Sequence, residues 1–190
     1  MTKGRMEAFS DGVLAIIITI MVLELKVPHG NTIEVLKPLL PVFISYILSF
    51  VIVGIYWNNH HHMLQAANKV NGSVLWANMH LLFWLSLFPF VTGWMGENNF
   101  TTIPVALYGA VLCMAGIAYY MLAHCLTNLH GNDSEFTKAL GSDRKGKISV
   151  FIYVIGIGLC FLNPLLGISS YFLVTFMWFV PDKRFEKKTE

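Results

Sequence analysis

Stretches of apolar residues alternate along the chain with short polar or Pro/Gly-containing connections. Most of these stretches reach the roughly 20 residues that a helix needs to cross a bilayer core. The pattern predicts an all-α integral membrane protein, a single domain over residues 1–190, with six transmembrane helices at 6–26, 38–57, 74–94, 104–126, 148–162 and 165–180. The last two stretches are short, and Asn163-Pro164 between them predicts a tight helical hairpin that either spans the bilayer or is re-entrant.

The second and third stretches carry features that extend or interrupt a helix. The second continues into a polar but helix-compatible segment that ends before Asn71-Gly72, so we expect a helix that projects beyond the membrane. Ser73 is suited to cap the third helix. Pro89 lies inside the third helix, and we expect a kink there, because membrane helices tolerate proline when neighbours supply hydrogen-bond partners.

Lysine and arginine are unequally distributed between the connections. If all six stretches span, eleven of the 13 basic residues fall on one side, and only Lys26 and Lys37 fall on the other. Cytoplasmic loops retain positive charge, so this bias predicts that both termini are cytoplasmic. The bias also accounts for the net charge of +2, which therefore gives no reason to propose a nucleic-acid partner.

Composition agrees with a membrane location. Hydrophobic residues make up 55% of the chain, charged residues 13%, and the mean hydropathy is +0.59, which excludes a soluble globular domain. The first apolar run is long enough to span and lacks a small-residue cleavage site, so we expect it to stay in the protein. Cys113, Cys125 and Cys160 have no paired spacing and are expected to be packing residues without a disulfide.

The first predicted helix is unusually polar for a membrane span. Arg5, Glu7 and Asp11 crowd its first two turns, and Glu24 closes its far end. Such groups are costly in lipid unless they face protein or water, so this helix is a candidate pore or site helix. One narrow stripe along it contains Gly12, Ile16, Thr19, Ile20 and Leu23. An apolar stripe ordinarily packs against other helices, but a stripe with one hydroxyl between two polar ends suits a narrow pore closed by branched side chains.

Three consecutive histidines, His60 to His62, raise the possibility of a metal site. Adjacent helical residues point about 100° apart, so the three cannot converge on one ion. We expect instead that some of these imidazoles meet the polar start of the first helix, where Ser10 and Asp11 need partners, together with Trp57, Asn58, Trp76, Asn78 and His80. No structural metal and no cofactor are expected.

Catalytic motifs are not apparent in the sequence, so we expect no catalytic residues and a protein that is not an enzyme. Two other classes compete with a channel. A small secondary transporter would carry inverted repeats and a broken helix at the bilayer midplane, and Asn163-Pro164 could be mistaken for one. A membrane metalloenzyme would use the histidine cluster, and its bound metal would be lost on changing His60 to His62.

The first helix resembles a known signature. Its pattern Arg5-x-x-x-Phe9-Ser10-Asp11-Gly12-Val13, followed by Leu23-Glu24-Leu25, is similar to that of the bacterial relatives of the endosomal and lysosomal potassium channel, transmembrane protein 175. The resemblance extends over the chain through Val27-Pro28, the polar stretch from Tyr56 to His61, and the closing Val180-Pro181-Asp182-Lys183-Arg184.

The resemblance implies a potassium-selective cation channel in the bacterial inner (plasma) membrane, with the first helices around a four-fold axis. Animal members carry two six-span repeats and form dimers, whereas this chain has one signature, so a homotetramer is implied. The family's constriction maps onto Ile16, its pore hydroxyl onto Thr19, and further apolar layers onto Ile20 and Leu23. The motif residues Arg5, Phe9, Ser10 and Asp11 are implied to lock helices together rather than to bind ions. Permeating monovalent cations, chiefly K⁺, and the lipid bilayer are the other expected partners.

Overall fold

The computed structural model describes residues 2–131, 134–140 and 144–179, and all regular structure in these residues is helical. The all-α prediction is therefore confirmed. The elements in chain order are α1 (Lys3–Met21), the 3₁₀ turn η1 (Val22–Glu24), the 3₁₀ segment η2 (Ile33–Leu39), α2 (Leu40–Ala66), α3 (Gly72–Ser86), α4 (Phe88–Glu97), α5 (Thr102–His130), α6 (Glu135–Leu140), α7 (Arg144–Cys160) and α8 (Pro164–Phe179).

Four helical units are long and apolar enough to cross a membrane. They are Lys3–Glu24 (22 residues), Ile33–Ala66 (34 residues), Gly72–Glu97 (26 residues) and Thr102–His130 (29 residues). The hairpin of α7 and α8 has shorter arms, of 17 and 16 residues. The fold is thus that of a multi-pass membrane protein, and the crossing of the bilayer by α7 and α8 stays a prediction.

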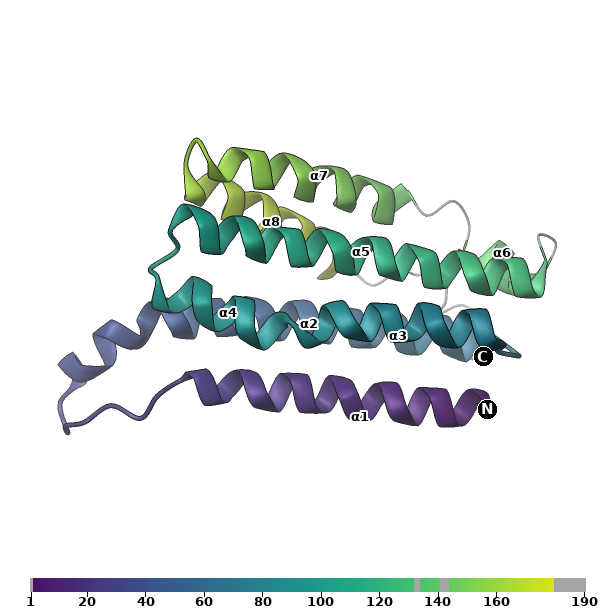
Figure 1. Cartoon of the computed structure of the whole chain (residues 1–190), viewed down its shortest axis with the longest axis horizontal. Helices are drawn as coiled ribbons and strands as arrows, with labels where there is room; N and C mark the ends of the chain where they lie inside the picture. The colour runs from purple at the N-terminus through teal and green to yellow at the C-terminus, as the bar shows by residue number, and fades with distance from the viewer. Residues whose placement is uncertain (1, 132–133, 141–143, 180–190) are drawn as a thin grey trace.

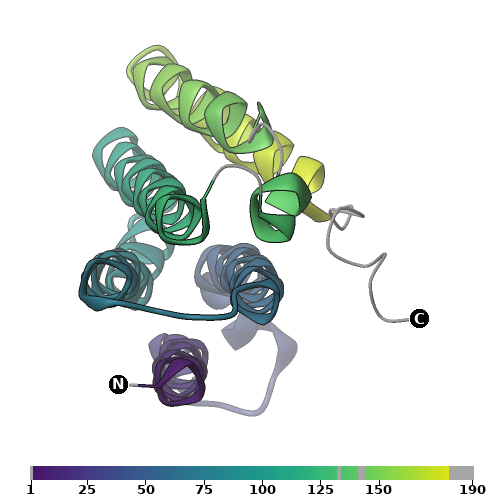
Figure 2. The same ribbon diagram turned by 90° about the vertical axis from the view of Figure 1, so that its right-hand side faces the viewer.

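The long helices lie side by side along the longest axis of the molecule (Figure 1). Viewed from the end, α1 lies at one edge of the bundle, α2 and α3 follow, and α7 with α8 forms the opposite edge (Figure 2). Helix α1 packs against α2, α3 and α4, while α5 packs against α3, α7 and α8. One side of α1 is consequently left without a neighbour from the described part of its own chain.

The third span is divided where the sequence predicts a kink. Helix α3 ends at Ser86 and α4 begins at Phe88, with Pro89 in the first turn of α4, where a missing N–H is tolerated. The expected cap at Ser73 is wrong: Asn71 is the N-cap, and its side-chain oxygen accepts a hydrogen bond from the Val74 N–H at 3.0 Å. Asn71 is extended, so its side chain reaches back to the first turn.

Close contacts near the far end of α1 fix how α4 sits against its neighbours. A Cβ atom added to Gly96 would lie 2.6 Å from the Val42 Cα atom, so α2 and α4 meet backbone to backbone. A Cβ atom on Gly93 would lie 2.8 Å from Glu24 Oε2, so the Glu24 side chain rests directly on α4. Gly96 leaves no room for a side chain between α4 and α2, and Gly93 provides the surface on which the Glu24 side chain lies.

Buried hydroxyls connect the middle of the bundle. Ser49 Oγ on α2 forms hydrogen bonds of 2.6 Å with Thr92 Oγ1 on α4 and 2.9 Å with the Tyr108 hydroxyl on α5. All three side chains are buried. Because an unpaired polar group in a membrane interior is costly, this shared set of hydrogen bonds holds three helices in one relative position.

Candidate functional site

Helix α1 has two faces that differ in what covers them. One face is buried against α2, α3 and α4 and consists of Met6, Ser10, Leu14, Ile17 and Met21. These residues recur every three or four positions, as one face of an α-helix requires. The opposite face is exposed in the single chain and contains Gly12, Ile16, Thr19, Ile20 and Leu23.

All four residues that the sequence analysis assigned to a pore therefore lie on the uncovered face. Ile16 is 58% exposed and Leu23 is 74% exposed, whereas Ile17 is only 4% exposed. A continuous apolar face of this kind must be covered by lipid or by another protein surface. The sequence stripe and the burial pattern agree on which side of the helix is outward.

Thr19 is the polar side chain in the middle of the uncovered face. Its Oγ1 donates its proton to the backbone carbonyl oxygens of Ala15 and Ile16, each at 3.0 Å. A hydroxyl that donates back to its own helix keeps its lone pairs directed outward. The face thus presents an oxygen acceptor, which attracts a cation.

A chain of buried hydrogen bonds holds the other face of α1. Ser10 Oγ donates to the Met6 carbonyl oxygen at 2.9 Å and accepts from Asn78 Nδ2 on α3, also at 2.9 Å. Asn78 Oδ1 in turn accepts from His60 Nε2 on α2 at 2.7 Å. Ser10, Asn78 and His60 are each at most 2% exposed. This Ser10–Asn78–His60 chain connects three helices through three side chains.

A second contact joins α1 to α2 at the same level. The Trp57 Nε1–H donates to Asp11 Oδ1 at 3.0 Å. Asp11 is exposed in the single chain, as are Arg5 and Phe9 of the same motif. With the described part of its own chain, Arg5 forms no ion pair or side-chain hydrogen bond.

Two expected partners of the first helix do not join this group within the described chain. Trp76 is 78% exposed, and His80 Nε2 accepts from Trp84 Nε1 at 2.9 Å on its own helix. Side chains two apart on a helix point about 200° away from each other. Of the three α3 candidates, Asn78 is the one that forms hydrogen bonds with α1 and α2 among the described residues, and the roles expected of Trp76 and His80 stay predictions.

The three consecutive histidines have different surroundings. His60 is buried in the hydrogen-bond chain, His61 is exposed with its ring stacked on Trp57 at 6.1 Å, and His62 is half-buried. Among the residues described, no three His, Cys, Asp or Glu side chains lie close enough together to hold a metal ion.

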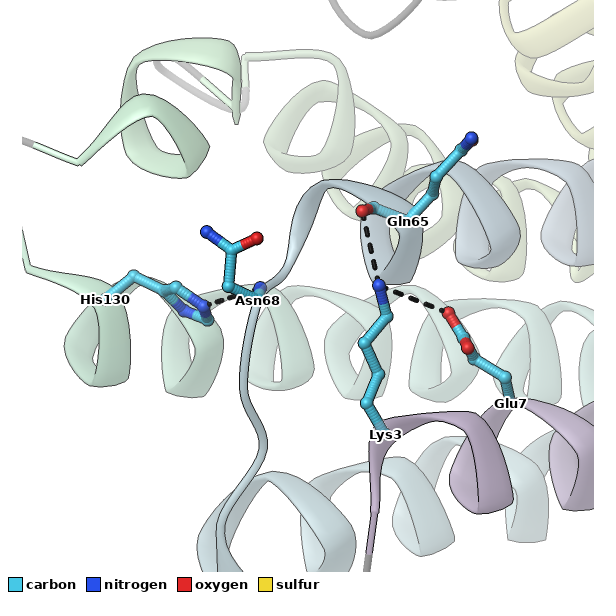
Figure 3. Close-up of polar contacts among 5 residues, drawn as sticks. All are labelled: Lys3, Glu7, Gln65, Asn68 and His130. Atoms are coloured by element: carbon cyan, nitrogen blue, oxygen red, sulfur yellow. Dashed lines mark hydrogen bonds and ion pairs between the residues drawn. The ribbon is translucent and has the colours of Figure 1, made fainter.

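The N-terminal end of α1 is tied to the end of α2 (Figure 3). Lys3 Nζ lies 3.6 Å from Glu7 Oε1 and donates to the Gln65 carbonyl oxygen at 3.3 Å. In the same region the Asn68 backbone N–H donates to His130 Nε2 at 3.0 Å, which ties the connection after α2 to the end of α5. Sequence reasoning missed these contacts because two of them use backbone atoms, which have no residue-specific signal.

The far end of α1 is tied to α4 by an ion pair that the sequence analysis also missed. Lys26 Nζ lies 2.6 Å from Glu97 Oε1, and the hydrogen bond and negative charge of Glu97 raise the pKa of Lys26. Lys26 is therefore charged at neutral pH, and its contribution to the pair is lost as the pH rises through that raised pKa. The sequence does contain one signal for this pair: Lys26 and Glu97 have opposite charges, and they lie where their helical units end on the same side of the bundle.

Fold and site together define a class: a multi-pass α-helical membrane protein whose first helix is locked on one face and uncovered on the other. Residues 5–89 match the family model described as the endosomal/lysosomal potassium channel TMEM175. A potassium channel of Chryseobacterium sp. (strain P1-3) is 56% identical over 187 residues, covering 98% of this chain and 97% of that protein. The chain belongs to the TMEM175 family of ion channels, which confirms the resemblance seen in its first helix.

More distant relatives also place the chain in the TMEM175 family. The crystal structure of a lysosomal potassium-selective channel TMEM175 homologue from Chamaesiphon minutus has a TM-score of 0.79 at 26% identity, and the match covers 95% of this chain and 97% of that one. The endosomal/lysosomal proton channel TMEM175 of Homo sapiens is 35% identical over 81 residues, which is 36% of this chain and 16% of the human protein. The family is a class of ion channels and not of enzymes.

Replacing Asn78 with alanine tests the hydrogen-bond chain. The change leaves the buried His60 Nε2–H without its acceptor, at a cost of about 1–3 kcal/mol. We expect Asn78→Ala to have a lower thermal unfolding midpoint than the parent protein. The measurement is tryptophan fluorescence during heating in mild detergent. Asn68→Ala is the matched control, because the Asn68 side chain is exposed and only its backbone N–H is bonded. Equal midpoints for Asn78→Ala and the parent would contradict the assignment.

Proposed function

We propose that four copies of the chain form a potassium-selective cation channel in the bacterial inner membrane, with the α1 helices around a central axis. Each chain would cross the bilayer six times, with both termini in the cytoplasm. The observation that carries this proposal is the uncovered face of α1, in which Ile16 and Leu23 are more than half exposed while the other face is locked. The potassium channels among the relatives support the choice of ion.

More than one copy is needed because one chain provides a single α1 helix, and the family resemblance implies four. A single helix cannot enclose a path for ions, and closed rotational symmetry is the usual way in which identical subunits surround an axis. The chain carries one copy of the signature helix. Four copies would bring four Ile16 side chains together at one level, with Ile20 and Leu23 in further layers.

Ile16 would act as a dehydration barrier. A ring of branched apolar side chains offers no ligand to an ion and excludes the water that surrounds it, so passage requires partial loss of hydration. A K⁺ ion releases water more readily than the smaller Na⁺ ion, so such a barrier favours K⁺. The outward lone pairs of Thr19, one turn further along, would replace part of the lost hydration.

The Ser10–Asn78–His60 chain would set which residues line the path. Neighbouring residues differ by about 100° around a helix, so a rotation of α1 by one position would replace Ile16 with Ile17 at the axis. Hydrogen bonds from Ser10 to α3, and from α3 to α2, resist this rotation. Their role is mechanical, and ions would not contact them.

The bias in basic residues supports the proposed orientation. With six spans, eleven of the 13 Lys and Arg residues lie on the side of the two termini. The Lys3 contacts with Glu7 and Gln65 would then lie at the cytoplasmic end, and the Lys26–Glu97 pair would lie at the external end.

Exchange of Ile16 for asparagine tests the barrier directly. Four amides at the ring would let water enter and keep the ions solvated. Ile16→Asn is therefore expected to raise single-channel conductance several-fold and to lower the K⁺/Na⁺ permeability ratio toward unity. The measurement is single-channel recording of purified protein in a planar bilayer under a K⁺/Na⁺ gradient. The parent should show stepwise openings.

Ile155→Asn is the matched control for this experiment. Ile155 is an exposed isoleucine of α7, at the edge of the bundle opposite α1 (Figure 2). Ile17 is unsuitable because it is buried, so an amide there would destabilise the fold. Parent-like currents from Ile16→Asn, or a leak from Ile155→Asn, would mean that the path lies elsewhere. A saturating flux without steps in the parent would point to a transporter.

Thr19 is tested by a pair of substitutions that separates its hydroxyl from its methyl group. Thr19→Ala removes the outward oxygen and is expected to lower the K⁺/Na⁺ permeability ratio without a larger total current. Thr19→Ser keeps the oxygen and is expected to keep the parent ratio, measured from reversal potentials in the same bilayers. If serine loses selectivity as alanine does, the hydroxyl is not what favours K⁺.

A further inference from the structure

A cavity of about 50 Å³ lies between α2, α5, α7 and α8, at the side of the bundle away from α1. One water molecule needs about 10–15 Å³ of such space, so the cavity holds roughly three to five water-sized groups, or a short run of methylenes. Its lining is mostly apolar and aromatic, and consists of Ile52, Ile55, Tyr56, Asn59, Gly116, Tyr119, Gly146, Ser149, Tyr153, Val174, Thr175 and Trp178. The cavity is not used by the proposed ion path.

Gly116 on α5 leaves this space open. A Cβ atom added there would lie 3.4 Å from Val150 Cγ2 and 3.8 Å from the Tyr56 hydroxyl, which are ordinary contacts. An alanine would fit, whereas a larger side chain would extend into the cavity. The small size of residue 116 therefore leaves this part of the cavity unfilled.

Two tyrosine hydroxyls in the wall have no partner in the described part of the chain. Tyr56 and Tyr153 line the cavity, and neither hydroxyl forms a hydrogen bond with a described residue. Polar groups within a membrane protein normally find a partner. A molecule in the cavity with an oxygen acceptor near its apolar part would accept a hydrogen bond from such a hydroxyl.

One end of the cavity is marked by basic and aromatic residues. Gly146 lines the cavity, and its neighbours Lys145 and Lys147 lie 5.5 Å and 5.9 Å from the ring centroids of Trp178 and Tyr120. Trp178 Nε1 also donates to Ser149 Oγ at 2.8 Å. Tryptophan, tyrosine and lysine gather where a protein meets lipid headgroups.

The sequence at this end is rich in cations. Arg144, Lys145 and Lys147 are three cations in four residues, against the single acidic residue Asp143 beside them in sequence. Arg144 and Lys147 are exposed. Basic clusters beside pockets between membrane helices on the cytoplasmic side bind anionic headgroups. An apolar cavity that ends in such a cluster matches an amphiphile with an apolar chain and a negative head.

We propose that this cavity binds one anionic glycerophospholipid from the leaflet on the Lys/Arg-rich side of the protein. Part of one acyl chain occupies the space beside Gly116, an ester oxygen accepts from the Tyr56 or Tyr153 hydroxyl, and the phosphate lies against the basic residues 144–147. The bound lipid fills the gap between α2 and the short α7–α8 hairpin. The proposal is independent of the ion path along α1.

The test measures lipid retention, which does not depend on conduction. Full-length protein in mild detergent is incubated with dioleoyl phosphatidylglycerol or dioleoyl phosphatidylcholine, and bound lipid is counted by native mass spectrometry. We expect retention of phosphatidylglycerol in preference to phosphatidylcholine. Gly116→Leu fills the cavity and should weaken retention about tenfold or more. The double variant Lys145→Gln/Lys147→Gln should weaken it about 30-fold.

Gly158→Leu is the matched control, because Gly158 on α7 is exposed and a Cβ atom added to it would meet no described atom of another helix within 4 Å. It should retain lipid as the parent does. Gly116→Val provides a smaller filling substitution if the leucine variant does not fold. Equal retention of the two lipids would overturn the proposal, because the basic residues would then not select an anionic head. Undiminished phosphatidylglycerol on a folded Gly116 variant would also overturn it, because binding would then not need the cavity. Normal currents from a protein without bound lipid would leave the channel assignment intact.

Discussion

The rotational setting of α1 is the constraint on which the rest of the structure depends. Ser10 receives a hydrogen bond from Asn78 and, through it, is connected to His60, so three helices share one buried polar chain. In an apolar surrounding none of these groups can be left unpaired without a large penalty. The apolar residues of α1 alone would permit several rotations, since isoleucine and leucine occur around much of its surface. The polar chain selects one of them.

The two ends of α1 are fixed by other means. At its start, Lys3 reaches Glu7 and the backbone of α2, and at its far end Glu24 rests on Gly93 while Lys26 pairs with Glu97. These charged groups are at or near the surface and contribute little to stability individually. Their effect is positional, because a helix held at both ends and in the middle presents the same face along its whole length. A narrow path for ions needs this continuity.

The sequence predicts the helices well because apolar length and proline act locally. The break near Pro89 and the extension of α2 to Ala66 follow from such local rules. Side-chain partners were harder to predict. Asn78 contacts Ser10 and His60, whereas Trp76 is exposed and His80 contacts Trp84. The contact of Glu24 with Gly93 depends on how two distant helices pack. The stripe of Ile16 and Thr19 is readable from periodicity alone, whereas what covers it lies outside the single chain.

Cysteine accessibility along α1 tests most directly whether its uncovered face lines the ion path. In a background with Cys113, Cys125 and Cys160 replaced by alanine, single cysteines are introduced on each face, and a charged, water-soluble thiol reagent is added during K⁺ current recording in planar bilayers. The account predicts block at the uncovered positions 16, 19 and 23 and no block at the buried positions 14, 17 and 21. Block at the buried positions, or unchanged current at all of the uncovered ones, would contradict it.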